Sequence, residues 1–387
     1  MSGGRHRFAG RTVGAMIDDA KIERLLTRVR REVDDGLLPA AQVAVAHDGK
    51  LIVDTTFGAP EDSRFLAFSA TKALVAAAIW RLIDQGSVRV DAPAAEYLPS
   101  FATNGKDVVT VEQLLTHTGG FPFAPLGPPR WLTRAGRLEA FAKWRLTMEP
   151  GDTFMYHPVA GHWVLGEIIA EVTGLDHTDA IEELVTQPLG LPRMLGIPVG
   201  HQERIVPSVS VGEPPTLEET EAATGARVDF SSLIPAEVAT DALLSLNHPE
   251  SRAVGVPGGG GVMRAADLAL LYQAFLHDPE GMWSPEILFA GTQEVRVDLP
   301  DMMGVPSHRT LGLILAGDDG KAELRGFGRT VSGRAFGHKG AGGQLAFADP
   351  VSGLSVGYIT PGLDQNIIRQ ERRDLAISSL AGDLLLD

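Results

Sequence analysis

The chain has 387 residues, of which 44% are hydrophobic and 21% charged, a composition typical of a folded globular protein. This length exceeds what one hydrophobic core usually serves, so we expect a two-lobed unit with a cleft, or a domain with a large insertion. The formal net charge of −15 argues against a nucleic-acid or anionic-membrane partner, because both need clustered Lys and Arg, and a small neutral or apolar ligand fits better.

Cysteine is absent, which excludes disulfides, thiolate metal ligands and cysteine nucleophiles. The basic start of the chain, residues 1–23, lacks the continuous apolar core of a signal peptide. No later run of about 18 apolar residues predicts a membrane helix. We therefore expect a cytoplasmic protein.

The first predicted elements are a helix and a hairpin. Apolar residues recur at helical spacing from Ile22 to Val33, and Gly36 follows as a stop signal. Two β-rich runs then flank Asp48-Gly49, a dipeptide typical of tight hairpin turns. The sheet is therefore predicted to begin antiparallel.

A helix without a polar face comes next, because residues 74–79 read LVAAAI, and we expect it to be the buried central helix. From Val88 to about Asn247 the sequence favours helical segments broken by Pro and Gly. A Gly-rich run, an amphipathic helix, four short strand-like runs and a last helix from about Gln365 to Leu386 follow.

This order predicts a mixed α/β (α+β) fold with a mostly antiparallel sheet, helices on both of its faces and a helical lobe. Residues 1–87 and 250–387 would form a discontinuous sheet domain. Residues 88–249 would form the mainly helical lobe, with the site between the two.

Ser69 and Lys72 stand out at the start of the buried helix. Residues three apart share a helix face, so both side chains would project into one space. Backbone N–H groups and low dielectric both depress the pKa of an ammonium, so Lys72 could accept the serine proton. The alternative is that Ser69 caps the helix and Lys72 reaches water.

The chain resembles the β-lactamase-related serine hydrolases, which include class C β-lactamases, D-alanyl-D-alanine peptidases and family VIII carboxylesterases. The resemblance rests on six segments in the family's order: FSATK, RVDAPAAEYLPSF, VTVEQLLTHTGG, MYHPVAGHWVLGEII, PGGGGVMRAADLALLY and FGHKGAGG. It implies a β-lactamase/transpeptidase-like fold. It also implies that Ser69 forms an acyl-enzyme, that Lys72 helps to deprotonate it, and that Tyr156 relays the proton to the leaving group.

The third motif of the resemblance falls on His338, Lys339 and Gly340, on a strand beside the cleft. Gly340 would let the substrate approach the backbone closely. The backbone N–H of Ala341, together with that of Ser69, would form the oxyanion hole.

Two positions depart from the family pattern. Pro158 replaces an Asn or Ser whose side chain holds the substrate amide in β-lactamases and peptidases. Lys339 replaces a small hydroxyl residue that recognises a substrate carboxylate, although a cation at this position could bind an anion differently. Both changes favour esters over β-lactams and peptides.

Other patterns carry no chemistry in this interpretation. Ser355 fits G-x-S-x-G, yet it lies in a strand-like run with no later histidine, and Gly258 to Gly261 matches no phosphate-binding motif.

Four histidines lack metal-ligand spacing, so we expect no metal; of these, His117 would hydrogen-bond a loop near the cleft. They are His117, His157, His162 and His338. Four aromatic residues could line an acyl or alcohol pocket or belong to the core: Phe121, Phe123, Trp131 and Phe154.

The resulting hypothesis is a serine hydrolase that cleaves a small-molecule carboxylic ester through an acyl-enzyme on Ser69, with no cofactor. An acyltransferase, or a weak β-lactamase or D-amino-acid peptidase, would use the same Ser-Lys-Tyr chemistry. A non-catalytic binding protein that keeps the fold is the alternative from another class. The physiological substrate and the oligomeric state stay open.

Overall fold

The computed structural model describes residues 17–229 and 236–386, so residues 1–16, most of the N-terminal stretch used to predict the location, lie outside it. Within this part, six strands form one sheet in the order β2-β1-β9-β8-β7-β6, and every neighbouring pair is antiparallel. The strands are β1 (Ala41–His47), β2 (Lys50–Phe57), β6 (Ile314–Leu315), β7 (Phe336–Gly337), β8 (Leu345–Asp349) and β9 (Leu354–Ile359).

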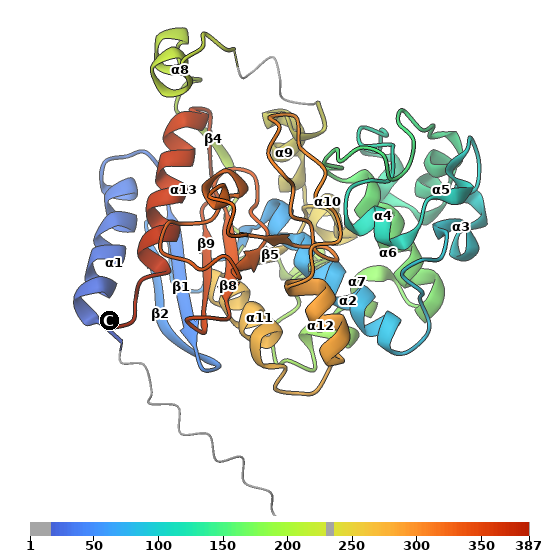
Figure 1. The fold of residues 1–387 in the computed structure, drawn as a ribbon, viewed down its shortest axis with the longest axis horizontal. Coiled ribbons are helices and arrows are strands. Elements are labelled where there is room, and N and C mark those ends of the chain that lie inside the picture. Colours follow the sequence, from blue (N-terminus) through green and yellow to red (C-terminus); the bar gives the residue numbers. More distant parts are fainter. Residues whose placement is uncertain (1–16, 230–235, 387) are drawn as a thin grey trace, which may run out of the picture.

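The turn between β1 and β2 is the predicted hairpin. Asp48 and Gly49 both have positive φ, 49° and 74°, which a two-residue turn of this hand requires. β1 then pairs on its other edge with β9, so segments from the two ends of the chain lie side by side, as the blue and red strands of Figure 1 show.

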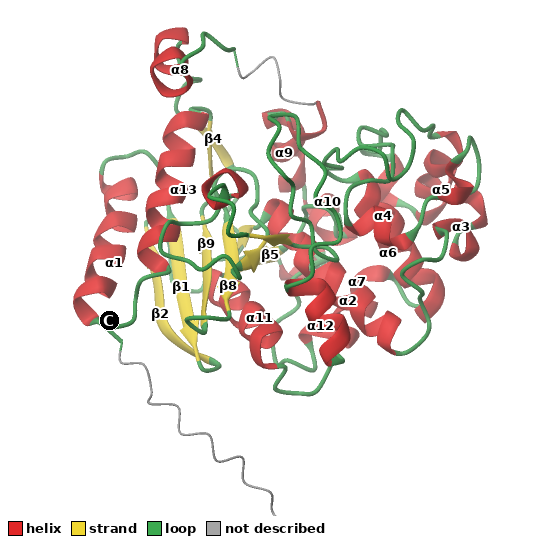
Figure 2. Ribbon diagram, viewed as in Figure 1, coloured by secondary structure: helices red, strands yellow, loops and turns green. Residues whose placement is uncertain are grey.

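Both faces of the sheet are covered by helices, as predicted. Val43 and Val45 on β1 belong to a core shared with α1 (Asp19–Asp34) and α13 (Ile367–Ala381). The alternating Ala44 and Ala46 point into the larger core, which includes α2 (Lys72–Asp84) and α11 (Ala265–His277). Figure 2 shows the red helices on either side of the yellow sheet.

Helices dominate residues 88–249, and Figure 1 shows most of them grouped on the side away from β1 and β2. They are α3 (Ala94–Tyr97), α4 (Val111–Leu115), α5 (Arg134–Lys143), α6 (Ala160–Thr173), α7 (His177–Ile181), α8 (Leu217–Thr224), α9 (Thr240–Leu244) and α10 (Pro249–Val254). A further helix, α12 (Pro285–Thr292), follows α11. The larger core contains residues of both α2 and α6, so the division into two domains stays a prediction.

Two small sheets lie outside the main one. β3 (Phe65–Leu66) pairs antiparallel with β5 (Val262–Met263), which places the Ser69 segment beside the Gly-rich run. β10 (Gly362–Asp364) pairs in parallel with β4 (Val209–Val211), a strand inside the predicted helical lobe.

Some predicted elements are shorter than expected. β6 and β7 each have only two residues. Gly312 and Gly317, with φ of 109° and 75°, turn the chain on either side of β6 and limit its length. α13 ends at Ala381, and Leu385 instead bridges to Ile17 near the start of α1.

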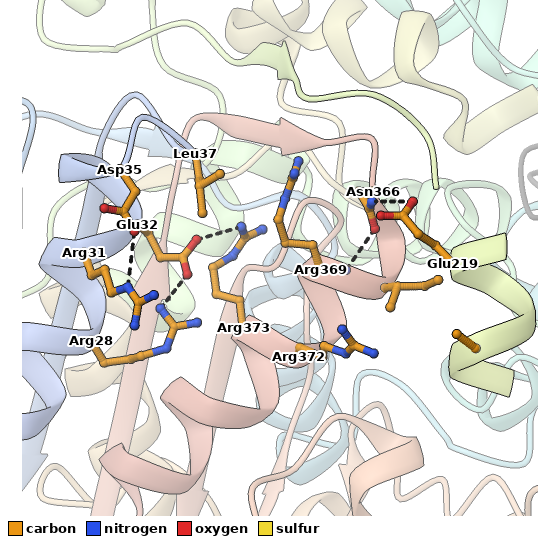
Figure 3. Close-up of a pocket in the computed structure, with 12 residues that line it drawn as sticks. Arg28, Arg31, Glu32, Asp35, Leu37, Glu219, Asn366, Arg369, Arg372 and Arg373 are labelled. Carbon is orange, nitrogen blue, oxygen red and sulfur yellow. Dashed lines mark hydrogen bonds and ion pairs between the residues drawn. The ribbon is translucent and has the colours of Figure 1, made fainter. Parts of the chain in front are cut away.

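A hollow of about 500 Å³ lies between α1, α13 and α8 (Figure 3). Figure 3 shows Glu32 of α1 between Arg28 and Arg373, and it is ion-paired with both. Arg373, which is fully buried, also lies 3.1 Å from Asp364 of β10. These ion pairs tie the first and last helices together. Among the described helices, none is both long and apolar enough to cross a membrane.

Candidate active site

Ser69 lies in a 3₁₀ turn, Phe68–Thr71, immediately before α2, and not within the helix as predicted. Side chains three residues apart are eclipsed in a 3₁₀ turn, which brings Ser69 directly over Lys72. Phe68 has a φ of 44°, a strained conformation for a residue with a large side chain. Thr71 anchors the turn, because its hydroxyl accepts a hydrogen bond from the Gly261 N–H at 2.9 Å.

Lys72 is fully buried, and its Nζ lies 3.2 Å from the Ser69 Oγ. The same nitrogen donates to the carbonyl oxygens of Pro158 at 2.8 Å and Gly258 at 2.6 Å. Burial, with a smaller contribution from the charge of Arg309, holds the pKa of Lys72 well below its ordinary value.

This arrangement fits a neutral amine, which has two N–H bonds and one lone pair. The two carbonyls accept both N–H bonds, so the lone pair is left for the hydroxyl of Ser69. A charged ammonium could donate its third N–H to the Ser69 Oγ, but it would also need a counterion, and no carboxylate lies within ion-pair distance of Lys72 in the described part of the chain.

Tyr156 lies against the amine, with the Lys72 Nζ 5.0 Å from the centroid of its ring. Burial raises the pKa of Tyr156 to about 12, against the opposing effects of the Ser69 side chain and Arg309. The protonated phenol is therefore the favoured form of Tyr156 at neutral pH. The hydroxyl has no partner of ordinary hydrogen-bond geometry among the described residues, so it faces Ser69 as a protonated, available donor.

His338 closes the other side of Tyr156, with ring centroids 6.0 Å apart. It follows β7 directly, and its backbone N–H still pairs with Ala346 of β8 at 3.0 Å. Its Nδ1 faces the Lys339 carbonyl at 2.8 Å. Burial, then the charges of Arg309 and Lys72, lowers the pKa of His338, so the imidazole is neutral.

His117 packs on Tyr156 as well, at 4.6 Å between ring centroids, and it has a φ of 62°. Its Nδ1 accepts the backbone N–H of His157 at 3.2 Å, which is the kind of loop contact predicted for it. Burial first, then Arg309, lowers the pKa of His117. In the part of the chain that the structure describes, no three His, Asp or Glu side chains are grouped so as to hold a metal ion.

Lys339 points away from this group. Its Nζ forms an ion pair with Glu371 of α13, at 2.9 and 3.1 Å from the two carboxylate oxygens. Burial lowers the pKa of Lys339, but Glu371 and Asp374 outweigh it and the net shift is upward. The charge of Lys339 is therefore already balanced within the protein.

The Gly340 backbone lies against the Ser69 segment. A Cβ at Gly340 would stand 2.3 Å from the Ala67 carbonyl oxygen, so only glycine fits. Its N–H bonds to Gln344 at 2.9 Å and closes a turn that contains Ala341. Among the turn and loop hydrogen bonds of the described residues, none is donated by the backbone N–H of Ser69 or of Ala341, as an oxyanion hole built from these two groups would require.

An apolar cavity of about 480 Å³ opens at Ser69. Pro158 and Gly258 line it, and its further walls are mainly aliphatic and aromatic: Phe68, Leu126, Trp131, Val159, Leu246 and Val256. Of the four aromatic residues left open by the sequence, only Trp131 belongs to this lining. Phe121 is core, Phe123 is 41% exposed on the surface and Phe154 packs beside His117.

Sequence reasoning missed two contributors to the site, Gly258 and Arg309. The Gly258 to Gly261 run, which matched no binding motif in the sequence, supplies the carbonyl of Gly258 to Lys72. Pro158 was already expected in the site, and the structure adds that its carbonyl oxygen accepts a hydrogen bond from Lys72. Arg309, which affects the pKa of Lys72, Tyr156 and His338, carries no local motif that could have marked it.

Ser355 is remote from this chemistry. It is fully buried on β9, and its hydroxyl donates to the Ala269 carbonyl at 2.7 Å, as expected of a structural serine.

The chain is similar in sequence to known proteins over most of its length. Residues 25–380 match the model of the protein family described as Beta-lactamase. Over 362 residues the chain is 26% identical to Esterase/beta-lactamase LipL of Mycobacterium tuberculosis, a match that covers 82% of this chain and 76% of that protein. It is 31% identical over 205 residues to Esterase EstB of Burkholderia gladioli, which covers 46% of this chain and 52% of that one.

Solved structures extend the likeness to nearly the whole fold. A penicillin-binding protein homolog from Caulobacter crescentus superposes with a TM-score of 0.76 at 26% identity, over 96% of this chain and 99% of the other. A family VIII carboxylesterase gives a TM-score of 0.71 at 25% identity, over 94% and 98%. The predicted β-lactamase/transpeptidase-like fold is confirmed.

Proposed function

This chain belongs to the Beta-lactamase family, as its six motif segments indicated, and on that premise we propose that it hydrolyses small-molecule carboxylic esters through an acyl-enzyme on Ser69. Relatives named as esterases, and the likeness to a family VIII carboxylesterase, support ester hydrolysis at the level of the family.

One observation carries the proposal. The Lys72 Nζ is buried, faces the Ser69 Oγ at 3.2 Å, and has both of its N–H bonds directed at the carbonyls of Pro158 and Gly258. A lysine so placed is a general base with its lone pair aimed at a single hydroxyl. A serine that only capped the helix would need no such neighbour.

The steps follow from the positions of the polar groups. The Ser69 Oγ attacks the ester carbonyl while its proton passes to the Lys72 Nζ. The N–H groups of Ser69 and Ala341 then hold the oxyanion. Tyr156, protonated at neutral pH, donates its proton to the leaving alkoxide and recovers one from Lys72. Water adds to the acyl-enzyme by the same route in reverse and releases the acid.

Esters are the favoured class for two reasons. Pro158 offers no side-chain amide to hold the amide of a peptide or β-lactam, since its only polar atom at the site is the carbonyl bound to Lys72. The cavity at Ser69 is mainly apolar, which suits a hydrocarbon acyl or alcohol group.

The test is acylation of the purified protein. After exposure to p-nitrophenyl butyrate or a fluorophosphonate, intact mass should show one adduct on the native chain and none on Ser69→Ala, while circular dichroism shows both proteins folded. An adduct on both proteins would move the nucleophile to another residue. No adduct on either would favour the binding-protein alternative.

Acyl transfer and β-lactam hydrolysis can each be tested with a different substrate. Added alcohols would yield transfer products if the acyl-enzyme is resolved by alcoholysis, which would make the protein an acyltransferase. A chromogenic cephalosporin tests β-lactam hydrolysis, which we expect to be slow because the side-chain amide is missing at Pro158.

A further inference from the structure

A hollow of about 260 Å³ beside α5, here called the α5 hollow, is lined by cations and aromatic rings. Its cations are Arg130, Lys143 and Arg145, and no Asp or Glu belongs to the lining. The chain as a whole carries a formal net charge of −15, so the charge of this hollow is opposite to that of the protein. The hollow is separate from the cavity at Ser69, although Pro125 lines both.

Two of the three cations have no partner. Arg130 and Arg145 are exposed, and neither side chain forms an ion pair or a hydrogen bond in the described part of the chain. Lys143 pairs with Glu139. The hydrogen bond and charge of Lys143, and more weakly the charge of Arg130, hold the pKa of Glu139 below its ordinary value. In the ion pairs of the described residues, one carboxylate is thus set against three cations.

A fourth cation lies behind this wall. Lys106 is fully buried, and its Nζ donates to the carbonyl oxygens of Trp144, at 2.7 Å, and Thr103. No carboxylate forms an ion pair with it among the described residues. Burial, and then the charge of Arg145, lowers the pKa of Lys106 to about 8, so the two positive charges repel each other at neutral pH. An anion in the α5 hollow would relieve this repulsion.

Aromatic rings form the rest of the wall. Phe121 and Trp144 are buried and stacked, with ring centroids 5.8 Å apart. Phe123 lines the same hollow and is 41% exposed, so its ring is open to a ligand. A planar ring packs favourably on such a surface, and cations at its edge select for a ring that carries negative charge.

The hollow between α1, α13 and α8 is also rich in arginine, but its charge is largely balanced from within. Glu32, Asp35 and Glu219 belong to its lining. An anion would therefore meet carboxylates there, which is not the case in the α5 hollow.

We propose that the α5 hollow is a binding site for a small aromatic anion, such as an aromatic carboxylate. The ring would lie against Phe123, with the anionic group toward Arg130 and Arg145, whose N–H groups are free to donate to it. At about 260 Å³ the hollow lies below the range of about 300–1,000 Å³ typical of drug-sized ligands, which suits a compound with one ring. The site lies outside the cavity at Ser69, so the proposal does not rest on the proposed function.

The test is calorimetric titration of the purified protein with benzoate and with benzyl alcohol, which has the same ring and no charge. Benzoate should bind the wild type at one site, and the Kd of benzyl alcohol should be about tenfold higher or more. Arg130→Gln and Arg145→Gln should each raise the Kd of benzoate about threefold, and the double variant about tenfold. Phe123→Ala should raise it about threefold, through loss of the ring contact.

Arg296→Gln is the matched control. It removes the same charge, but the side chain of Arg296 is already paired with Glu112 and Glu294 and lines neither the α5 hollow nor the cavity at Ser69. Its Kd for benzoate should stay at the wild-type value. Circular dichroism checks the fold of each variant, and if one of the two arginine variants does not fold, the other carries the comparison.

Equal affinity for benzoate and benzyl alcohol overturns the proposal, because the charge would then play no part. An unchanged Kd in the folded double variant also overturns it, since benzoate would then bind elsewhere. A loss of the same size in Arg296→Gln would reduce the effect to long-range attraction, and absence of binding at millimolar benzoate would refute the site directly. Because the readout is binding and not turnover, failure of the proposed ester hydrolysis would leave this test intact.

Discussion

The carbonyl oxygen of Gly258 lies 2.6 Å from the Lys72 Nζ and joins two segments that are distant in sequence. A Cβ at Gly258 would stand 2.8 Å from the Pro158 carbonyl oxygen, the second acceptor of the same amine. The glycine therefore lets two carbonyls converge on one nitrogen. This geometry buries the amine of Lys72 between two acceptors and keeps it out of water, as the proposed role of a base requires.

Lys72→Arg should be as inactive as Lys72→Met. A guanidinium keeps its proton at any working pH, so it cannot accept one from Ser69. Loss of a general base lowers turnover by about 10²- to 10⁴-fold. The measurement is kcat/KM with p-nitrophenyl butyrate, alongside circular dichroism to confirm folding. Substantial activity in Lys72→Arg would mean that another group takes the proton.

Activity on a neutral ester should rise with pH and then level off as Lys72 loses its proton. Burial, and secondarily Arg309, lowers the pKa of Lys72, so the plateau should begin well below the ordinary lysine pKa. Arg309→Met removes a positive neighbour, the pKa of Lys72 rises, and the acid limb should move to higher pH. Tyr156, with a pKa of about 12, adds no alkaline loss below about pH 10.

The pH profile of kcat/KM checks this, with Arg296→Met as the control whose limb stays in place. A limb that stays in place or moves to lower pH in Arg309→Met would contradict the assigned base.

The features that could be predicted from the sequence were those set by residues close together in the chain. Asp48-Gly49 predicted the first hairpin because the turn needs two positive φ angles, and the apolar run at 74–79 predicted α2 because no polar face was left. Ser69 and Lys72 were found together because three residues of spacing place them on one side of the chain.

Contacts between residues far apart in the chain could not be predicted, because they arise only from the tertiary fold. Arg309 contacts Tyr156 only through the tertiary fold, and no periodicity in either segment encodes that meeting. The ion pair of Lys339 with Glu371 depends on how α13 lies on the sheet. Burial, which also depends on the tertiary fold, is the main cause of the raised pKa of Tyr156.

Gly340→Ala should abolish most of the activity. The new Cβ would meet the Ala67 carbonyl oxygen at 2.3 Å. Gly340 directly precedes Ala341, and Ala67 lies two residues before Ser69, so the clash falls next to both N–H groups of the proposed oxyanion hole. A shift that relieves the contact moves the N–H of Ala341, and loss of one such donor costs about 10²- to 10³-fold in kcat. Gly200→Ala is the control, because nothing lies within 4 Å of its Cβ position. Near-native kcat in Gly340→Ala would show that the oxyanion is held elsewhere.

Arg373→Met should destabilise the protein without changing its chemistry. Arg373 is fully buried and lies 3.2 Å from Glu32 and 3.1 Å from Asp364, so its removal leaves two buried carboxylates short of a partner. Breaking a buried ion pair costs about 3 kcal/mol or more. Arg28 still pairs with Glu32, and Arg369 still pairs with Asp364. The free energy of unfolding should therefore fall by about 3 kcal/mol and not more.

Urea unfolding at pH 7 measures this loss, and Arg31→Met provides the matched control. Arg31 lines the same hollow, but its pair with Asp35 is exposed, so its removal should change the free energy of unfolding by about 0.5 kcal/mol or less. This hollow shares no lining residue with the cavity at Ser69, so ester turnover per folded molecule should be equal in both variants. A stable Arg373→Met protein would show that the buried carboxylates take up protons or water in its place, and that the terminal helices are held by their apolar core alone.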